Sequence, residues 1–417
     1  MSRESPTTRG WLRNLPREWS VVRLRYLAEI TTGSGDTQDA DDGPYPFIVR
    51  SQTPLGSSEY TFDTEAILTV GDGAVGEVFH HIRGRFHVHQ RVYVLHSFST
   101  RIVSRFLYYF FLSFFKLIAQ DGSARTTVDS VRRWMLTDMP VAVPPVGDQR
   151  RIADYLDRET AEIDAFIADQ ERLIELLTER RAAVANRLVT RGSNERAALR
   201  VVSLPWLNEA PKHWQTCQVK RLFLSMVYGT SDPATEGPVT ALAMGDIQGG
   251  RVLDADRGGF PIVPLGLDLR RGDILFDRTN GSADVVGKVG LFDGDGTNTT
   301  FASYLVRLRT VNAVDSAWAV FLLNSAAFWP FARSHAIKTL QVNLSPSRYG
   351  SLPVVLPPLE EQRSIGTRIR EESVELNTAI ADAQQAVALS RERRAALITA
   401  AVTGQIDVTR RGGAVHG

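Results

Sequence analysis

The stretch MPVAVPPVGDQRRIADYLD (Met139–Asp157) occurs a second time, in diverged form, as LPVVLPPLEEQRSIGTRIR (Leu352–Arg370). The likeness continues without gaps to Thr190 and Thr403, and 20 of the 52 aligned positions are identical. Internal similarity at one fixed offset is typical of a duplicated structural unit. The two stretches therefore predict one module that is present twice in the 417-residue chain.

The front of each copy also matches. Pro16–Trp19 (PREW) pairs with Pro211–Trp214 (PKHW) at an offset of 195, whereas the offset is 213 at the exit stretch. Ile67-Leu68 against Ile274-Leu275 gives an intermediate offset of 207. The region between entry and exit is therefore 18 residues longer in the second copy, and we expect the insertions in loops of a shared fold.

Each Pro-Pro pair is followed by about 40 residues without proline, in which apolar positions step alternately by four and three. This spacing is the heptad pattern of helices that pack side by side at a shallow angle. The stripe residues include Ile163, Ile167, Ile174 and Leu177 in the first helix, and Leu376, Ile380, Val387 and Leu397 in the second. Each helix would be roughly 60 Å long. We expect the two helices to pair, and the alternative is that each packs on its own globular domain.

The region before each helix contains short alternating strands and one apolar helix. The expected strands are Ala66–Val70, Arg91–Leu95, Asp273–Phe276 and Tyr304–Leu308, and the expected helices are Phe106–Ala119 and Ala317–Ala332. Short strands with glycine-rich turns and few helices indicate an α+β class with two mixed α/β domains.

Composition points to a globular protein of a reducing compartment. Apolar residues make up 43% of the chain, and the single Cys217 excludes a disulfide framework. The first residues lack the apolar core of a secretory signal, and the stretch 106–119 is too short to span a bilayer. We therefore expect a cytoplasmic location without membrane contact. The net charge of +1 gives no global support for nucleic-acid binding.

Catalytic signatures are not apparent: no P-loop occurs, and no Gly-x-Gly-x-x-Gly opens a βαβ unit. The best metal candidate is VFHHIRGRFHVHQR, with His80, His81, His87 and His89, in which the last two share one face of a strand. The second copy lacks these histidines. The favoured interpretation is that these are surface histidines, or histidines that contact nucleic acid, on a basic hairpin with Arg83, Arg85 and Arg91, and a metal site is the alternative.

Polar and basic loops occupy corresponding places in both copies. Arg, Lys, Asn and Gln can contact base edges, while Ser and Thr hold phosphates, although any one of these residues could equally be a solvated loop residue. The candidates in the first copy are Arg83, Arg85, His87, His89, Gln90, Arg91, Arg125, Thr126 and Thr127. Those in the second copy are Arg278, Thr279, Asn280, Ser282, Lys288, Tyr304, Lys338, Thr339, Gln341 and Asn343.

Taken together, these motifs resemble the specificity subunits of Type I restriction-modification systems. The entry motif is LPREWSVVRL, repeated as APKHWQTCQV, and the Ile-Leu strand with its glycine turn is ILTVGDGAVGEV, repeated as ILFDRTNGSADVVGKV. The exit motif DMPVAVPPVGDQRRIADYLD, repeated as SLPVVLPPLEEQRSIGTRIR, is the most specific of the three. The order domain, helix, domain, helix covers nearly the whole chain.

The resemblance implies two target recognition domains, at residues 1–145 and 193–358. It also implies two conserved spacer helices, at 146–192 and 359–404, pairing as an antiparallel coiled coil, with a tail at 405–417. Each domain would read one half of a split, asymmetric site in double-stranded DNA. The helices would dock two methyltransferase subunits, which carry S-adenosylmethionine, and restriction subunits, which use ATP and Mg²⁺. The chain itself would hold no cofactor and no catalytic residue.

Two other classes stay open from the residues alone. One is an enzyme, either a metal-dependent nuclease using the histidine stretch or a single-chain methyltransferase. The other is a helical interaction scaffold that does not touch DNA.

Overall fold

The computed structural model describes residues 15–122, 131–233, 235–253, 255, 258–282, 284–338, 341–406 and 408. The chain divides into two compact units. Unit 1 comprises residues up to 171 together with those from 385 onward, and unit 2 comprises residues 172–384. Each long helix thus contributes residues to both units, whereas we expected each helix to be a segment separate from the globular domains.

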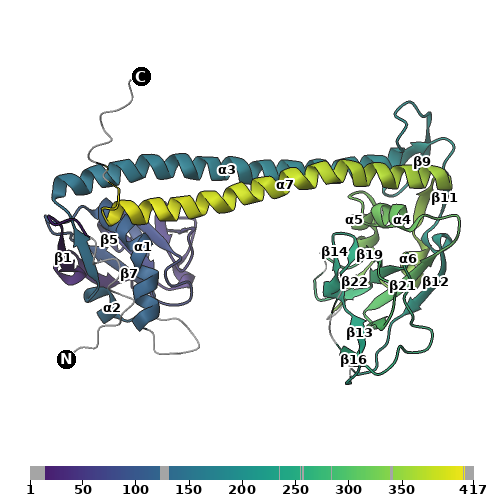
Figure 1. The fold of residues 1–417 in the computed structure, drawn as a ribbon, viewed down its shortest axis with the longest axis horizontal. Helices are drawn as coiled ribbons and strands as arrows, with labels where there is room; N and C mark the ends of the chain where they lie inside the picture. Colours follow the sequence, from purple (N-terminus) through teal and green to yellow (C-terminus); the bar gives the residue numbers. More distant parts are fainter. Residues whose placement is uncertain are drawn as a thin grey trace. The chain divides into compact units, whose positions relative to one another are not determined.

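Unit 1 contains a six-stranded sheet in the order β2-β7-β5-β6-β3-β4 (Figure 1). Its neighbours are antiparallel except for β3 and β6, which are parallel. The strands are β2 (Glu29–Thr32), β3 (Tyr45–Ile48), β4 (Leu55–Ser57), β5 (Phe62–Val70), β6 (Phe79–Val88) and β7 (Val92–His96). Helix α1 (Ser104–Gly122) packs its phenylalanines on this sheet, and the short helix α2 (Arg133–Thr137) follows. The predicted strands at 66–70 and 91–95 and the predicted helix at 106–119 are thereby confirmed.

Unit 2 contains a larger set of strands. Its main sheet has the order β12-β21-β17-β19-β15-β14, and two three-stranded sheets have the orders β16-β13-β20 and β18-β23-β22. The main strands are β12 (Phe223–Tyr228), β14 (Ile247–Gln248), β15 (Arg251–Val252), β17 (Ile274–Asp277), β19 (Val289–Leu291) and β21 (Leu305–Thr310). The smaller sheets use β13 (Val239–Leu242), β16 (Gly258–Phe260), β18 (Thr279–Asn280), β20 (Thr299–Phe301), β22 (Ile337–Lys338) and β23 (Val342–Asn343). A hairpin of β9 (Leu199–Leu204) and β10 (Leu207–Pro211) precedes them.

The apolar segment 317–332 forms two helices instead of the one that we expected. These are α4 (Ser316–Leu323) and α5 (Phe328–Ser334), and α6 (Pro346–Ser351) follows later. Asn324 is the C-cap residue of α4, and its side-chain amide bonds to both the N–H and the carbonyl of Val289. The Ser325 hydroxyl then accepts the Phe328 N–H at 3.2 Å and starts the next helix. These local bonds compete with continued helix.

In both units the entry strand pairs with the exit strand. β1 (Ser20–Arg23) runs antiparallel to β8 (Pro140–Val143), and β11 (Gln215–Gln218) runs antiparallel to β24 (Pro353–Leu356). The two ends of each globular domain therefore meet at the start of a long helix. Short 3-10 helices lie at Leu24–Tyr26, Thr37–Asp39, Val219–Leu222 and Met244–Asp246.

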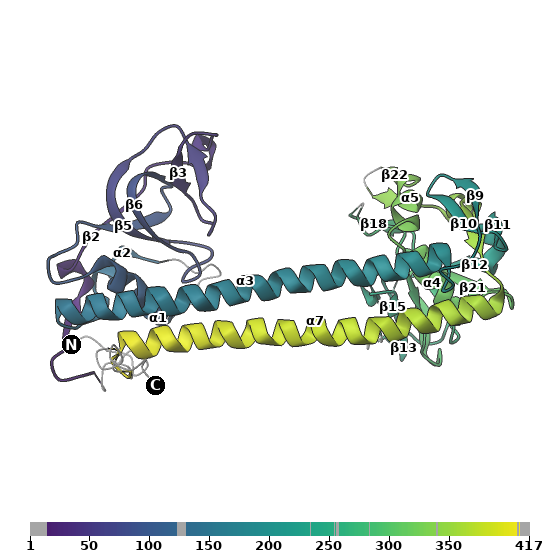
Figure 2. The same ribbon diagram turned by 90° about the horizontal axis from the view of Figure 1, so that it is seen from above.

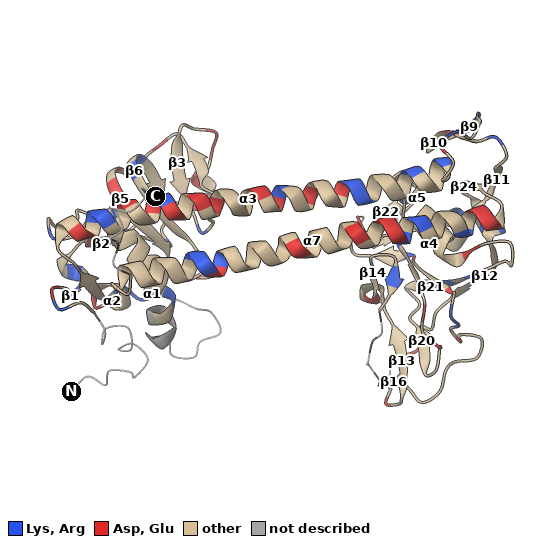
Figure 3. Cartoon of the chain, turned by 45° about the horizontal axis from the view of Figure 1, so that its top comes forward, with Lys and Arg blue, Asp and Glu red and all other residues tan. Residues whose placement is uncertain are grey.

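Helix α3 spans Val146–Arg191 and helix α7 spans Leu359–Val402. Within each unit their segments lie side by side and antiparallel (Figure 2), since rising numbers on one helix meet falling numbers on the other. The stripe residues named from the sequence are buried or half-buried in this pairing, whereas most of their helix neighbours are exposed. Both helices carry acidic and basic residues along their length (Figure 3).

One ion pair shows how the repeat governs this packing. In unit 1 the Arg394 guanidinium binds Asp164 through two bonds, Nε to Oδ1 at 2.7 Å and Nη2 to Oδ2 at 3.1 Å. In unit 2 Arg181, the same repeat position as Arg394, donates to the side-chain oxygen of Asn377. Asn377 in turn is the repeat position of Asp164. The same contact is therefore ionic in one unit and has a neutral acceptor in the other.

A buried glutamine joins the domain of unit 1 to its long helix. The Gln149 side chain is 0% exposed. Its Oε1 accepts the Val103 N–H at 2.7 Å, next to the start of α1. Its Nε2 donates to the carbonyls of Arg101 and Pro144, both at 2.8 Å. The amide thus satisfies three main-chain groups where the domain, the exit strand and the helix meet.

Gln362 repeats this joint in unit 2 and is also 0% exposed. Its Oε1 accepts the Asp315 N–H at 2.8 Å, next to the start of α4. Its Nε2 donates to the carbonyls of Ala313 and Pro357, at 3.1 and 2.8 Å. We call these two residues the joint glutamines.

The ends of the long helices also use one arrangement twice. Gly192 after α3 and Gly404 after α7 have positive φ angles of 76° and 71°. A Cβ atom at either glycine would lie 3.2 Å from Cζ2 of an entry tryptophan, Trp214 in unit 2 and Trp19 in unit 1. Glycine is required at both positions because it supplies the left-handed backbone and the close approach.

Candidate nucleic-acid interface

The structure brings two polar segments together at the same place in each unit. One is the loop that follows the central strand, β5 or β17, and the other is the segment that leads into α2 or α6. In unit 1 the Val131 N–H donates to the Gly71 carbonyl at 2.8 Å, and in unit 2 the Leu344 N–H donates to the Arg278 carbonyl at 2.8 Å. Val131 and Leu344 are equivalent positions of the repeat. We call this place the loop junction.

In unit 2 the loop junction is a small sheet. Strand β18 carries Thr279 and Asn280 and pairs with β23, where Asn343 lies opposite Thr279. The Asn343 Nδ2 donates to the Thr279 hydroxyl at 3.0 Å. Two predicted stretches that lie about 60 residues apart in the sequence therefore form one surface. Gln341 is exposed beside them.

Most of the other candidate residues of unit 2 are also described by the structure. The Arg278 guanidinium lies over the Tyr228 ring at 5.1 Å, and its Nε donates to the Ser303 carbonyl at 3.0 Å. Lys288 is half-buried, with Nζ donating to the Ile247 carbonyl at 3.0 Å. Tyr304 and Ser282 are exposed. Thr339 and the side chain of Lys338 lie outside the described residues.

Asp277, at the end of β17, was missed by the sequence reasoning. Its side chain is 0% exposed. Oδ2 accepts the Asn280 Nδ2 at 2.9 Å, and Oδ1 is buried without a hydrogen-bond partner. Burial raises the pKa of this carboxyl to about 6, although the bond from Asn280 and the charge of Lys288 lower it. The available signal was a carboxylate that ends an apolar strand where the first copy has Val70.

In unit 1 the basic candidates lie at two places along β6. Arg83 and Arg85 are exposed at the middle of the strand. Arg85 is paired, since its Nε donates to Asp63 Oδ2 at 3.0 Å and its guanidinium lies 4.9 Å from the centre of the Tyr60 ring. Arg83 has no hydrogen bond or ion pair with any residue that the structure describes, so its charge is available to a ligand.

Gln90 and Arg91 lie beyond the end of β6, nearer the loop junction. Both are exposed. Gln90 Nε2 donates to Asp36 Oδ2 at 3.2 Å, and Arg91 Nη1 lies 3.7 Å from Asp72 Oδ2. Arg50 approaches the other oxygen of Asp72 at 3.5 Å. The sequence candidates Arg125, Thr126 and Thr127 lie outside the described residues.

The interpretation of His87 and His89 as surface residues is wrong, because each is only 5% exposed. β3 pairs with β6 at His87, and Gly35 bridges to His89 and lies close to the His87 ring, so both edges of this strand end are covered. His87 packs on the Phe47 ring at 4.6 Å. His89 Nδ1 accepts the Arg91 N–H at 3.0 Å, and burial lowers the His89 pKa, so the neutral ring acts as an acceptor.

The four histidines also have separate surroundings. His80 Nε2 lies 3.1 Å from the Ser51 carbonyl, and His81 Nε2 lies 3.1 Å from Glu65 Oε1. Within the described part of the chain no group of three or more His, Cys, Asp and Glu side chains is placed to hold a metal ion. That part also contains no helix long and apolar enough to cross a membrane.

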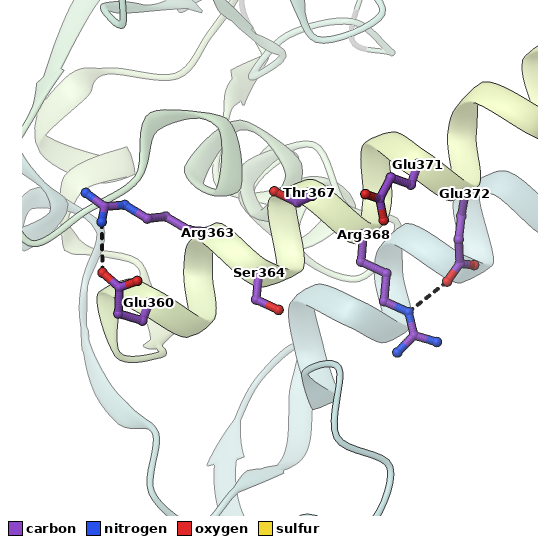
Figure 4. Close-up of a pocket in the computed structure, with 7 residues that line it drawn as sticks. All are labelled: Glu360, Arg363, Ser364, Thr367, Arg368, Glu371 and Glu372. Carbon is purple, nitrogen blue, oxygen red and sulfur yellow. Dashed lines mark hydrogen bonds and ion pairs between the residues drawn. The ribbon is translucent and has the colours of Figure 1, made fainter.

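A surface depression lies along the first turns of α7 (Figure 4). Its lining residues are Glu360, Arg363, Ser364, Thr367, Arg368, Glu371 and Glu372. Arg363 pairs with Glu360 at 2.8 Å and Arg368 pairs with Glu372 at 2.9 Å. Because the lining arginines are neutralised by these glutamates, the depression does not stand out as a site for a charged ligand.

Part of the chain is similar in sequence to known proteins. Residues 16–175 match the family described as the Type I restriction modification DNA specificity domain. The EcoDI specificity subunit from Escherichia coli is 32% identical over 171 residues, which cover 41% of this chain and 37% of that protein. The EcoKI specificity subunit from E. coli K12 is 26% identical over 260 residues, which cover 60% of this chain and 54% of that protein. The matches thus span about half the length of these relatives or less.

Solved structures share the fold over most of the chain. One, from a structure of complex assembly and conformational transition of the type I R-M system, has a TM-score of 0.70 and 15% identity. It covers 94% of this chain and 100% of its own. The HsdS subunit from Thermoanaerobacter tengcongensis has a TM-score of 0.50 and 14% identity, and covers 96% of this chain and 100% of its own. The mixed α/β domains with long helices are therefore an architecture already seen in specificity subunits.

Proposed function

We propose that this chain, whose residues 16–175 match the Type I restriction modification DNA specificity domain, is a specificity subunit that reads a split, asymmetric site in double-stranded DNA. Each loop junction would contact one half of the site. The chain would act without a catalytic centre of its own, as the recognition subunit of a methylating and cleaving complex.

One observation carries the proposal: the same loop junction occurs in both units with different side chains. Unit 1 offers the exposed Gln90 and Arg91 near its junction, whereas unit 2 offers Asn280, Asn343 and the stacked Arg278. Arginine commonly pairs with guanine, and asparagine or glutamine pairs with adenine in the major groove. Two readers with different side chains are what an asymmetric split site requires.

Partner subunits fit the same proposal. The candidate arginines of unit 1 are largely paired with carboxylates, and the net charge of the chain is +1. Since affinity for DNA depends strongly on neutralised phosphates, we infer that tight binding needs additional basic surface from partners. Two methyltransferase subunits with S-adenosylmethionine would supply it, and restriction subunits with ATP and Mg²⁺ would join them. This chain would bind none of these cofactors.

The test uses the full chain, alone and with co-expressed methyltransferase subunits. We expect methylated adenines in a split motif only in the mixture, as measured by single-molecule sequencing, and tight gel-shift binding only with the partners present. Methylation by the chain alone would support a single-chain enzyme and contradict the proposal. Stoichiometric metal in the purified chain would favour a nuclease.

Domain-specific variants sharpen the test. Gln90→Ala with Arg91→Ala should change the recognised bases in one half of the motif, and Asn280→Ala with Asn343→Ala in the other half. Arg172→Ala, an exposed residue of α3 whose charge pairs with Glu175, is the control and should leave the motif unchanged. If every variant methylates the wild-type motif at the wild-type rate, the loop junctions do not read DNA.

A further inference from the structure

The end of the central strand differs chemically between the two units. Asp277 ends β17 in unit 2, and Val70 ends β5 in unit 1 at the equivalent position of the repeat. Both side chains are 0% exposed. Burying a carboxylate costs free energy unless its oxygens form hydrogen bonds or ion pairs. Burying a valine at the same place carries no such cost. Unit 2 therefore carries an unfavourable group that the shared fold does not need.

Asp277 is held by an amide rather than by a cation. In the described residues it forms no ion pair, and Lys288, whose charge lowers its pKa, directs its ammonium to the Ile247 carbonyl. The facing residue of β21 is Leu305, and Thr279 and Asn280 follow on its own chain. Among the described side chains Asn280 donates to it at 2.9 Å, and the Thr279 N–H is a main-chain donor that also lowers its pKa, while Oδ1 has no hydrogen-bond partner.

This contact fixes the orientation of the Asn280 amide. Asn280 Nδ2 donates to Asp277, and Asn280 Oδ1 accepts the Ser282 N–H at 3.2 Å. An amide group that is held at both ends cannot exchange its oxygen and nitrogen without losing both bonds. Asn280 is half-buried and keeps one N–H and one oxygen lone pair for a ligand. That combination is the one that pairs with the edge of adenine.

We propose that Asp277 is a positioning residue, which orients Asn280 to read one base of the half-site recognised by unit 2 and makes this reading depend on protonation. The inference rests on the proposed function. The ionised carboxylate accepts a charge-assisted hydrogen bond, which is stronger than the bond to a neutral carboxyl.

Because burial raises the pKa of Asp277 to about 6, the carboxyl is mainly ionised at pH 7.5 and mainly protonated at pH 5. Discrimination at this base should therefore be high at pH 7.5 and decline through pH 6. Unit 1 has Val70 at the equivalent position, so discrimination in its half-site should show no such step.

The experiment uses the complex with methyltransferase subunits and DNA duplexes in which each base pair of the motif is changed in turn. Competition binding at pH 5.5 and 7.5 gives the discrimination at each position. We expect Asp277→Val to lower discrimination about tenfold at one position of the unit 2 half-site. Asp277→Asn should show the low value at both pH values, because its amide does not titrate in this range.

A merely structural role predicts the opposite pattern. If Asp277 only supports the fold, Asp277→Val should lower the thermal midpoint and weaken binding equally at all positions. Our proposal predicts an unchanged or higher midpoint, because a buried carboxylate is removed, together with lost discrimination at one base. Asp277→Asn, which keeps the shape, provides the same comparison if the valine variant does not fold.

The outcomes separate this inference from the proposed function. A wild-type complex that binds no split site contradicts the proposed function itself. A wild-type complex that reads the split site, with variants that keep the wild-type pH profile and discrimination, overturns only the role of Asp277.

Discussion

The two units share their joints and differ in their loop junctions. Gln149 and Gln362 each satisfy three main-chain groups at corresponding places, although the globular domains differ in length by 18 residues. At the loop junction, by contrast, unit 1 buries Val70 and unit 2 buries Asp277. Buried main-chain donors and acceptors must be satisfied whatever the protein binds, and this requirement keeps a joint constant. Side chains at the loop junction are free of that requirement and can diverge.

The largest expected effect comes from giving unit 1 the carboxylate of unit 2. Val70→Asp places a carboxyl group in the core of unit 1. Gly73 stands there at the repeat position of Asn280 and has no side-chain amide that could donate to this carboxyl group. We expect a loss of about 3–5 kcal/mol in the free energy of unfolding at pH 7.5, and a smaller loss at pH 4, where the acid is neutral. Urea unfolding followed by circular dichroism at both pH values measures it.

Val70→Ala is the control for the Val70→Asp variant, because it removes apolar volume without adding charge. Its loss of stability should be the same at both pH values. Equal losses for the two variants at pH 7.5 would show that unit 1 tolerates the carboxylate, and the contrast between the units would then be one of sequence only.

Substitution of the joint glutamines should give the next largest loss of stability, and the loss should be the same in both units. Gln149→Ala and Gln362→Ala each leave one buried N–H and two carbonyls without partners, so we expect each to lower stability by about 2–4 kcal/mol. Gln90→Ala, at an exposed residue, should change it by less than about 0.5 kcal/mol. Calorimetry of the three variants compares them directly. A large effect in only one unit would contradict the idea of a shared joint.

Substitution of Asn280 should change the recognition of DNA in one half-site only. Asn280→Ala removes the amide that we propose reads a base, and should cost about 1–3 kcal/mol of discrimination at one position. The same position should lose its pH dependence. Methylation sequencing of the variant complex gives the recognised motif. A relaxed base in the half-site of unit 1 would show that the assignment of loop junctions to half-sites is reversed.

The smallest effect concerns the helices. Arg394→Ala breaks the two-bond pair with Asp164 and should cost about 0.5–1 kcal/mol, an effect that declines as salt is added. Arg181→Ala, at the equivalent position, loses a bond to the neutral Asn377 and should be less sensitive to salt. Asn377→Asp should make the second position behave like the first. Thermal midpoints at low and high salt measure all three.

Much of the fold could be predicted from the sequence because the repeat exposes the positions that packing holds constant. The apolar stripe of the helices, the Pro-Pro stretches before them and the equivalent strands at Ile67 and Ile274 all follow from residue spacing alone. The split of the segment 317–332 was missed, because apolar spacing does not reveal that Asn324 binds Val289 from another strand. Attention to Asn324 and Ser325 within the apolar run could have suggested it.

The site was harder to predict. The burial of His87 and His89 depends on β3 and on Gly35, which lie about 40 to 55 residues earlier, so alternation along one strand could not reveal it. Thr279 and Asn343 were both named, but their contact arises from a three-stranded sheet that the sequence pattern did not indicate. Asp277 could have been found by aligning the copies at Val70, since only one of them has a charge there.

The pairing of entry and exit strands has a consequence for evolution. Because β1 lies against β8 and β11 against β24, everything between them leaves and returns at one point of the frame. A recombination event between two genes that share the entry and exit motifs would replace a complete domain and keep every joint. If each domain reads one half of a DNA site, as we propose, such an exchange would change one half of the recognised site in a single genetic step.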